Sequence, residues 1–419
     1  EVLRSLIDAG ALAQEEASGR WYATRDVADI AIPDTLQGVL LARIDRLQEE
    51  ARRVLQMASV IGRIFLYRIL AEIAQAECDL EGELLTLQRE EMIRERARIP
   101  ELEYIFKHHL TQEAAYNGLL KRERRTYHRR VAEALERLFP DRIEEQVGLL
   151  AHQWERAGVT DKAVSYLIQA GDYGRKSYAC TEAIAHYDMA LELAESTSLP
   201  DTILAAIHER RGQTFASIDN LSAARHDLYW VLEWARRRGD RVKEAETLLE
   251  LISPLLTGHE LDQAHACAQE AHAIAAALGD NRLIARSTGA LGAALCVRGD
   301  LERARDYLQT ALAAVQAFEV RDWPTEILQY YLLERYWRGD FGEVVGRVDE
   351  FLPVAEATRT PVLAYGIYLF GAWAWCSLGD YETALELLAQ AHELAQEAGI
   401  TTAPAELLNS MGWIHQEIY

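Results

Sequence analysis

Residues 288–315 read TGALGAALCVRGDLERARDYLQTALAAV, and this stretch decides the fold. Its first half carries an apolar stripe in which Gly292 leaves room for a second helix to approach closely. Gly299 is expected to end the first helix in the left-handed conformation, and Asp300 to cap the next one. Three apolar residues of the second half then face back across the pair: Ala304, Leu308 and Ala311. The stretch therefore predicts two helices packed against each other across a tight turn.

The small residue near the start of the second helix recurs at a fixed step of 40 residues, at Ala224, Ala264, Ala304, Val344 and Ala384. A constant period in this range is typical of a solenoid of repeated helix pairs. The spacing of small residues is similar to the tetratricopeptide pattern, whose usual repeat has about 34 residues, so that each unit here is longer by about six. The alternative, a general alanine-rich helical bundle, gives no reason for a constant step.

The composition limits the class of protein. The chain has 419 residues, 49% of them hydrophobic and 26% charged, which is typical of a globular protein with several domains or a repeat array. Its formal net charge of −22 argues against nucleic-acid binding by the bulk surface. Five scattered cysteines without a CxxC pair indicate a reducing compartment and no metal site. We expect no apolar run of the roughly 18 residues that cross a membrane and see no signal peptide, so we predict a cytoplasmic chain that is a piece of a longer one.

The first third of the chain has a different pattern of predicted elements from the repeats. Its amphipathic segments predict four helices, at residues 35–47, 49–61, 67–76 and 79–92. Two short strands are predicted to follow, at residues 93–97 and 103–106, joined by a turn at Pro100. Three or four helices followed by a small hairpin form the outline of a winged helix.

Three separated blocks carry a resemblance to a known family: IPDTLQ and LARIDRL (32–37 and 41–47), ASVIGRIF (58–65), and YIFKHHL with EAAY (104–110 and 113–116). In order and spacing they resemble the bacterial signal-transduction ATPases with numerous domains. These proteins include the MalT type, and others are fused to class III adenylate or guanylate cyclases or to transcriptional regulators.

The resemblance implies a domain order for the chain. Residues 1–30 would be a remnant of the ATPase helical lid, and residues 31–120 a winged-helix-like domain. Residues 121–200 would be a helical linker with the first repeats, and residues 201–419 a solenoid that is truncated at its C-terminal end. The predicted fold is therefore all-α, with a winged-helix-like domain followed by a right-handed tetratricopeptide-like α-solenoid of helix pairs about 40 residues long.

The resemblance also implies a nucleotide, ATP or ADP, bound by a missing upstream nucleotide-binding domain. This chain has no GxxxxGK[ST] loop to cradle phosphates, so we expect it to hold no cofactor and to catalyse no reaction alone. The resemblance places His108 where a histidine after the hairpin contacts the phosphates of that nucleotide. A ring N–H suits this role because it donates a hydrogen bond to a phosphate oxygen. The alternative for His108 is a partly buried cap of a helix at residues 109–118.

A basic stretch at residues 121–130 raises the question of DNA, because winged helices often bind it. Its cations are Lys121, Arg122, Arg124, Arg125, Arg129 and Arg130. They follow the predicted wing, however, and the third helix of the fold offers only Arg68 for reading bases. We therefore interpret the stretch as a solvated helix face or a docking surface for an acidic neighbouring domain.

A ligand groove is predicted on the concave face of the solenoid, where first helices face inward. The residues expected to line it are Gln329, Leu333, Tyr336, Trp337 and Trp373. Aromatic residues at helical spacing are also typical of ordinary core packing, and that alternative stays open. The sequence shows no pattern of catalytic or metal-binding residues.

These observations support two functional hypotheses and leave a third. In the first, the chain is a regulatory sensor of a nucleotide-switched signalling ATPase, with repeats that bind a protein partner or a small inducer. In the second, it is a freestanding tetratricopeptide scaffold that gathers protein partners. The third, an enzyme with an unrecognised site, has no motif behind it.

Overall fold

The computed structural model describes residues 12–14, 21–24, 36–74, 79–177, 179–218, 220–320, 323–358, 360–397 and 403–418. The chain divides into two compact units, Glu1–Ala170 and Gly171–Tyr419, here called the N-terminal and the C-terminal unit. Most of the expected lid remnant at residues 1–30 lies outside the described residues. Within it, two short antiparallel strands are described, β1 (Leu12–Gln14) and β2 (Trp21–Ala23).

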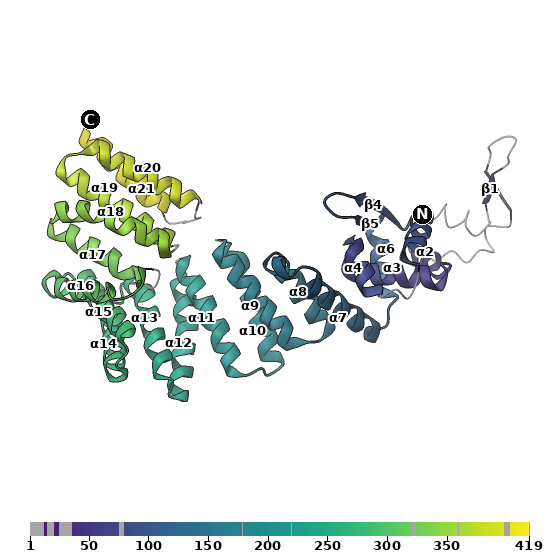
Figure 1. The fold of residues 1–419 in the computed structure, drawn as a ribbon, viewed down its shortest axis with the longest axis horizontal. Helices are drawn as coiled ribbons and strands as arrows, with labels where there is room; N and C mark the ends of the chain where they lie inside the picture. Colours follow the sequence, from purple (N-terminus) through teal and green to yellow (C-terminus); the bar gives the residue numbers. More distant parts are fainter. Residues whose placement is uncertain are drawn as a thin grey trace. The chain divides into compact units, whose positions relative to one another are not determined.

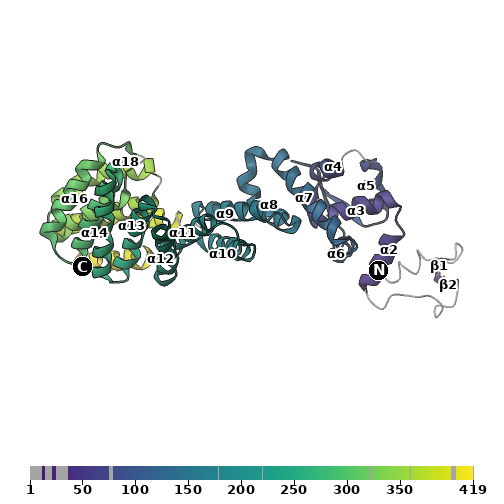
Figure 2. The ribbon, with the colours of Figure 1, turned by 90° about the horizontal axis from the view of Figure 1, so that it is seen from below.

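The N-terminal unit is a cluster of helices around a small sheet (Figures 1 and 2). Its elements after β2 are α2 (Leu36–Asp45), α3 (Glu49–Ile61), β3 (Ile64–Leu66), α4 (Tyr67–Ala74), α5 (Leu80–Arg89), β4 (Ile93–Ala97), β5 (Glu103–Phe106), α6 (His109–Asn117), α7 (Lys121–Leu138), the 3-10 turn η2 (Pro140–Arg142) and α8 (Ile143–Ala157). The three strands are antiparallel in the order β3-β5-β4. Both predicted strands and the predicted helices are confirmed, whereas β3 was not predicted.

A buried hydrogen-bond relay ties four helices of the N-terminal unit together. The Gln153 amide nitrogen faces the carbonyl oxygen of Val60 (3.4 Å), so its Oε1 faces His128 and accepts from Nδ1–H (2.6 Å). Nε2 of His128 is then the acceptor for the Tyr116 hydroxyl (3.0 Å). Burial lowers the pKa of His128 to about 4, although the bond to Gln153 opposes that shift, and the imidazole is therefore neutral.

The C-terminal unit is a solenoid of helix pairs. After α9 (Thr160–Lys176), within which the two units meet, its helices are α10 (Cys180–Ser196), α11 (Asp201–Ser217), α12 (Leu221–Arg238), α13 (Arg241–Thr257), α14 (Leu261–Leu278), α15 (Asn281–Val297), α16 (Leu301–Val315), α17 (Thr325–Arg338), α18 (Phe341–Thr358), α19 (Pro361–Leu378), α20 (Tyr381–Glu397) and α21 (Ala403–Ile418). We call the odd-numbered members from α11 onward first helices and the even-numbered members from α12 onward second helices. The tetratricopeptide-like solenoid that the sequence predicts is confirmed.

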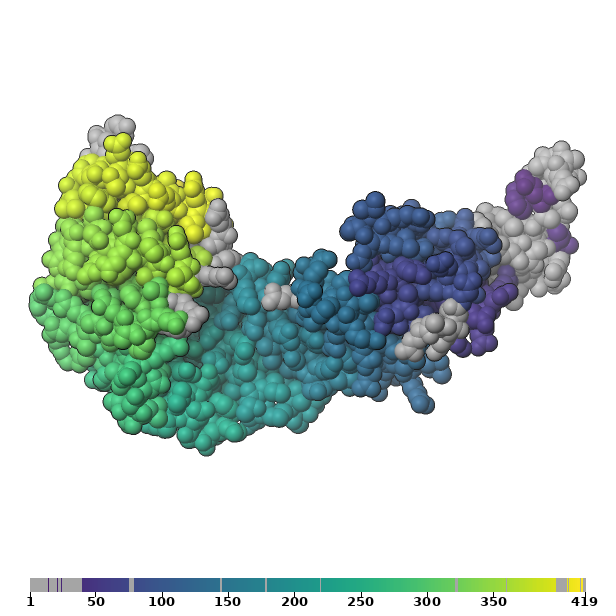
Figure 3. Space-filling view, in the orientation of Figure 1, coloured from purple at the N-terminus to yellow at the C-terminus, as the bar shows by residue number. Residues whose placement is uncertain are grey.

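The pairs of this unit follow one another along an arc in Figure 1, and Figure 3 shows them as consecutive bands of colour. Each first helix packs on its own second helix. From α13 to α19, each first helix also touches the first helix of the next pair. The first helices therefore form one continuous wall, here called the first-helix wall.

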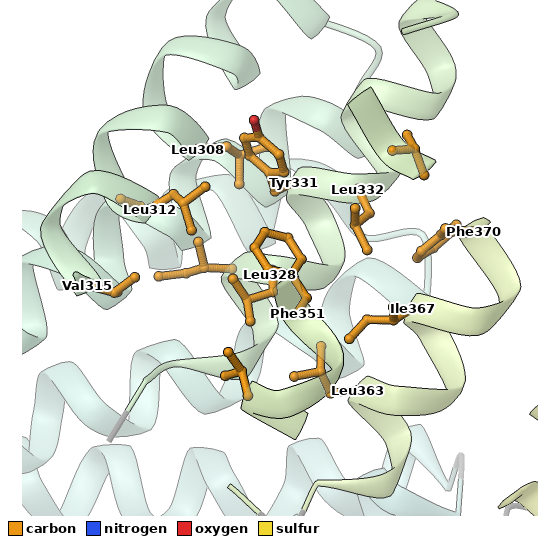
Figure 4. Packing of buried hydrophobic residues seen from close by; sticks show 14 of the residues in the cluster. Leu308, Leu312, Val315, Leu328, Tyr331, Leu332, Phe351, Leu363, Ile367 and Phe370 are labelled. Atoms are coloured by element: carbon orange, nitrogen blue, oxygen red, sulfur yellow. The ribbon is translucent and has the colours of Figure 1, made fainter. Parts of the chain in front are cut away.

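The small residues that recur every 40 residues lie in the core. Ala224, Ala264, Ala304, Val344 and Ala384 are all 0% exposed. Larger residues fill the space between pairs, and Figure 4 shows Leu308, Leu328, Phe351 and Ile367 from four successive helices packed into one cluster. A repeat core of this kind is continuous along the chain, so each pair depends mainly on its nearest neighbours.

The turn inside each pair needs a left-handed residue. Gly299, Gly339 and Gly379 occupy this position with φ between 82° and 88°. The equivalent position of the earlier pair holds His259, whose φ is 58°. A residue with a Cβ is strained in this region of φ. The turn at His259 therefore carries backbone strain that the three glycine turns avoid.

Helix α19 corrects one expectation from the sequence. In the described part of the chain it is the helix long and apolar enough to cross a membrane, with 18 residues and a mean hydropathy of 1.3. The expectation that no run reaches this length is therefore wrong. The physical reason lies in the packing of α19, which touches α17, α18, α20 and α21, so that 56% of its residues are buried inside the structure.

Replacing Gly292 by Ala tests the close approach of α15 and α16. A Cβ there would lie 2.6 Å from Cγ and 3.2 Å from the backbone nitrogen of Leu308, so we expect overpacking that lowers the free energy of unfolding by about 1–3 kcal/mol. The matched control is Gly346→Ala in α18, because a Cβ at that position meets nothing within 4 Å. The control should be neutral or stabilising by about 0.5–1 kcal/mol. Hydrogen exchange of α15 and α16 measures the effect of Gly292→Ala, and hydrogen exchange of α17 and α18 measures the effect of the control. Equal losses in the two pairs would contradict the close approach.

The His128 relay predicts a pH dependence for the N-terminal unit. The folded pKa of about 4 lies below the ordinary 6.5 of an unfolded histidine, so the relay stabilises fully above pH 6.5 and is lost as pH falls towards 4. Between pH 7.5 and pH 5 the loss is about 2 kcal/mol. Hydrogen exchange of α7 and α8 at the two pH values should show this loss, and the non-titrating variant His128→Gln should lack it. The same pH dependence in both proteins would contradict the assignment.

Candidate functional site

The predicted ligand groove lies on α17 and α19, which are neighbouring first helices. Gln329, Leu333 and Trp337 follow one another at steps of four residues and therefore share one face of α17, with Tyr336 beside them. The helix ends at Gly339, whose φ of 82° turns the chain into α18. Trp373 stands on α19, so the five predicted residues come from two adjacent repeats.

Aromatic side chains from these helices contact one another. The ring centroids of Tyr336 and Trp373 are 5.6 Å apart, which joins the two repeats directly. Phe341 lies 5.4 Å from Tyr336, and Phe370 lies 5.5 Å from Trp373. Nε1–H of Trp373 also donates to Oγ of Ser410 on α21 (3.0 Å). The structure thus gathers Tyr336 and Trp373 into an aromatic cluster that reaches three first helices.

Solvent exposure separates the members of the groove. Trp337 is 46% exposed, whereas Tyr336, Trp373, Leu333 and Gln329 are half-buried. Leu333, Tyr336 and Trp373 also pack against the core, so ordinary packing accounts for part of their position. Core packing gives no account of Trp337. The ligand-binding role of the five residues stays a prediction.

A network of ion pairs holds the end of α17. Arg335 is 2% exposed, and its guanidinium lies 3.3 Å from the carboxylate of Glu334, 3.4 Å from that of Glu343 and 3.3 Å from that of Asp340. Burial raises the pKa of Glu334, while Arg335 and Arg338 oppose the rise. The network fixes the turn that carries Trp337, so the exposed indole is presented from a rigid element.

Sequence reasoning missed a charged column along the first-helix wall. Glu246, Arg286 and Glu326 are separated by 40 residues each and so occupy the same position of three successive repeats. Nε of Arg286 lies 3.5 Å from Oε1 of Glu326, and Lys243 pairs with Glu246 at 3.6 Å and with Glu209. The 40-residue step was the signal that could have placed these charges side by side.

Glu250 is the most perturbed carboxyl group of this wall. Gln213 Nε2 donates to its Oε1 (2.8 Å), and Arg175 donates to the amide oxygen of Gln213 (2.7 Å). Burial raises the pKa of Glu250 to about 7, and the carboxylate of Glu209 adds to the rise. A polar ladder therefore runs from α9 through α11 to α13 on the first-helix wall.

A buried His–Asp pair joins α11 to α12. His208 Nδ1 lies 2.8 Å from Oδ1 of Asp227, and Arg211 binds both oxygens of that carboxylate at 2.7 Å. The imidazole of His208 stacks on Trp230 with 4.4 Å between centroids. Because both partners are nearly fully buried and saturated by Arg211 and Trp230, the pair fixes the two helices against each other. Across the described residues, no group of three or more His, Cys, Asp or Glu side chains is placed to hold a metal ion.

The structure does not place His108 as a partly buried cap of α6. This residue precedes α6 at the capping position, but its side chain is exposed and makes no capping hydrogen bond. The alternative of a partly buried capping histidine is therefore wrong, because the imidazole lies in solvent even though the backbone at His108 (φ −126°, ψ 139°) is extended, as is usual at a helix N-cap. The nucleotide-sensing role of His108 stays a prediction.

The basic stretch lies on α7 and is partly used inside the N-terminal unit. Arg124 donates to the carbonyl oxygens of Leu119 (3.1 Å) and Asn117 (2.9 Å) and lies over the ring of Tyr116. The guanidinium of Arg68 on α4 lies 5.5 Å from the ring centroid of Phe139. Both cations thus have structural partners within the unit. These contacts favour the interpretation of the stretch as a helix face and not as a surface that binds DNA bases.

Comparisons with known proteins give limited guidance. No family model matches the chain. An uncharacterized protein of Rhizobium meliloti (strain 1021) is 35% identical over 108 residues, which make up 26% of this chain and 10% of that protein. The match therefore spans about a tenth of the length of this curated relative.

Solved structures with a similar course of the chain include the following three. A Rap protein complexed with competence and sporulation factor is 14% identical, with 91% of this chain and 98% of that chain covered and a TM-score of 0.46. Aspartyl phosphate phosphatase F from Bacillus subtilis is 13% identical, with coverage of 92% and 96% and a TM-score of 0.49. A signal transduction ATPase with a tetratricopeptide repeat sensor from Pyrococcus horikoshii is 15% identical, with coverage of 92% and 68% and a TM-score of 0.41. Likeness at this level transfers no ligand or activity to this chain.

Proposed function

We propose that the C-terminal solenoid is a sensor that binds a peptide or protein segment on its first-helix wall, around Tyr336, Trp337 and Trp373. The observation that carries the proposal is the 46% exposure of Trp337 beside the half-buried pair of Tyr336 and Trp373. An exposed indole next to packed aromatic rings offers a partner a large apolar contact at low entropic cost.

The form of the solenoid supports a peptide over a small inducer. The groove residues extend along α17 and across to α19, so the apolar surface is elongated. An extended chain matches such a surface, whereas a compact molecule is normally held in an enclosed pocket. The net charge of −22 adds a general preference for partners without a large negative charge.

We propose further that the chain is the regulatory part of a nucleotide-switched signalling ATPase. On this proposal residues 31–120 are a winged-helix-like domain, and the hairpin of β4 and β5 is its wing. His108, exposed directly after the hairpin, would donate to a phosphate of ATP or ADP held by an upstream nucleotide-binding domain. Binding at the solenoid would then bias the nucleotide switch, and the cyclase or transcriptional output belongs to the longer protein.

Replacing Trp337 by Ala tests the binding surface. Heptapeptides selected from a random library on the full chain serve as probes. We expect the variant to bind them about 2 kcal/mol more weakly, about 30-fold in Kd, because a central aromatic anchor is lost. The fold should be spared, since nearly half of the indole is already in solvent. Fluorescence anisotropy with labelled peptides measures the affinity.

The matched control is Tyr229→Ala on the second helix α12, an aromatic residue that is 37% exposed. Its binding should equal that of the wild type. The proposal fails if no peptide is selected, or if the two variants lose the same affinity.

A further inference from the structure

A pocket of 330 Å³ opens at the N-terminal ends of three successive first helices, α15, α17 and α19. Its lining includes Arg282, Arg286, Trp323, Thr325, Glu326 and Thr360. All of these residues belong to the C-terminal unit.

The charges of the pocket are unbalanced. Two arginines face one glutamate, so the pocket carries a net positive charge in a chain whose total is −22. Arg286 pairs with Glu326 at 3.5 Å through one nitrogen, which leaves the other donors of its guanidinium available. Arg282 is exposed, and its guanidinium has no ion-pair partner among the described residues. A guanidinium that is held at the rim of a pocket without a carboxylate is a binding group for an anion.

Two helix starts lie at the pocket as well. Thr360 lies at the start of α19, where its hydroxyl is already engaged, because it donates to the carbonyl oxygen of Thr358 at 3.3 Å. Thr325 is the first residue of α17. The starts of α17 and α19 add the positive ends of two helix dipoles to the two guanidinium groups. A single net positive charge suits a carboxylate, which carries one negative charge, better than a phosphate dianion, which Glu326 would repel.

The pocket lies at one end of the stripe that forms the groove. Thr325, Gln329, Leu333 and Trp337 are spaced by four residues and so share one face of α17. Over these 12 residues the helix rises about 18 Å. An extended peptide covers that distance with about five or six residues at roughly 3.3 Å each.

We propose that this pocket is a carboxylate subsite of the peptide groove. It would bind the C-terminal carboxylate of an extended peptide whose large apolar side chain, five or six residues earlier, contacts Trp337. Arg282 and Arg286 would hold the carboxylate by charge-assisted hydrogen bonds. The inference rests on the proposed peptide-binding function and adds to it the chemical class of the ligand and its direction along α17.

Two N-acetylated heptapeptide libraries test the proposal on the full chain. Both lack Asp and Glu, and they differ only in a free or an amidated C terminus. Peptides retained by the protein are counted by mass spectrometry. We expect the free-acid library to be enriched at least tenfold over the amide library, with a large apolar residue at the first or second position.

The double variant Arg282→Gln/Arg286→Gln should lower the affinity for the best free-acid peptide at least tenfold and leave its amide unaffected. Arg303→Gln on the second helix α16 is the matched control, because this exposed arginine lies outside the pocket. It should bind as the wild type does. The melting temperatures of all three proteins show whether folding is preserved.

The outcomes separate this inference from the function on which it rests. Peptides that depend on Trp337 but show no preference for a free carboxylate overturn the subsite and leave the peptide sensor standing. Free-acid peptides that bind the double variant and the wild type with equal affinity would mean that the carboxylate binds elsewhere. This result would also overturn the subsite. Stronger competition by inorganic phosphate than by acetate identifies a phosphate site and rejects the carboxylate. If neither library is retained at all, the peptide sensor itself fails.

Discussion

Contact between the two helices of each pair at one small side chain every 40 residues is the constraint on which the rest of the solenoid depends. At Ala224, Ala264, Ala304, Val344 and Ala384 no solvent reaches the side chain. Gly292 faces Leu308 at a distance that leaves no room for a Cβ. Close packing of this kind admits few alternative arrangements of the two helices. The regular step, in turn, brings the same position of successive first helices side by side, as the ion pair between Arg286 and Glu326 shows.

This regularity turns sequence positions into columns on the first-helix wall. One column contains Glu246, Arg286 and Glu326, and another contains Leu333 and Trp373. The backbone of the first helices repeats from pair to pair, but the side chains at equivalent positions differ. The chemical nature of the wall therefore changes along its length. The polar ladder around Glu250 lies on α13, and the aromatic cluster of Tyr336 and Trp373 joins α17 to α19. The anion pocket at Arg282 lies between them in the chain, so that one scaffold offers different chemistry at successive repeats.

The sequence was sufficient for features that local rules determine. The predicted helix at residues 49–61 coincides with α3, and the predicted strands coincide with β4 and β5, because caps, turns and apolar spacing act within a few residues. It was not sufficient for β3, since three residues become a strand only by pairing with the distant β5. The strained turn at His259 could not be predicted either, because the glycine of this turn, Gly258, lies one position earlier and has a φ of −78°. The groove residues were chosen correctly as neighbours in the case of Tyr336 and Trp373. Their burial, and the contrasting exposure of Trp337, depend on side-chain directions that spacing alone does not give.

The placement of ion pairs explains why an acidic chain can leave an arginine available. The chain has 66 acidic and 44 basic residues. Several cations of the solenoid pair with a carboxylate of another helix. Arg236 of α12 pairs with Glu270 of α14 at 2.8 Å, Arg298 after α15 with Asp262 of α14 at 3.1 Å, and Arg338 of α17 with Glu302 of α16 at 2.6 Å. Such exposed pairs stabilise little individually, so the buried small residues rather than these bridges hold the pairs together. An exposed cation without a carboxylate partner therefore lowers the stability of the fold very little. Its charge remains available to a ligand. Because the packing constraint lies between first and second helices, the first-helix wall is free to carry such a group without weakening the core beneath it.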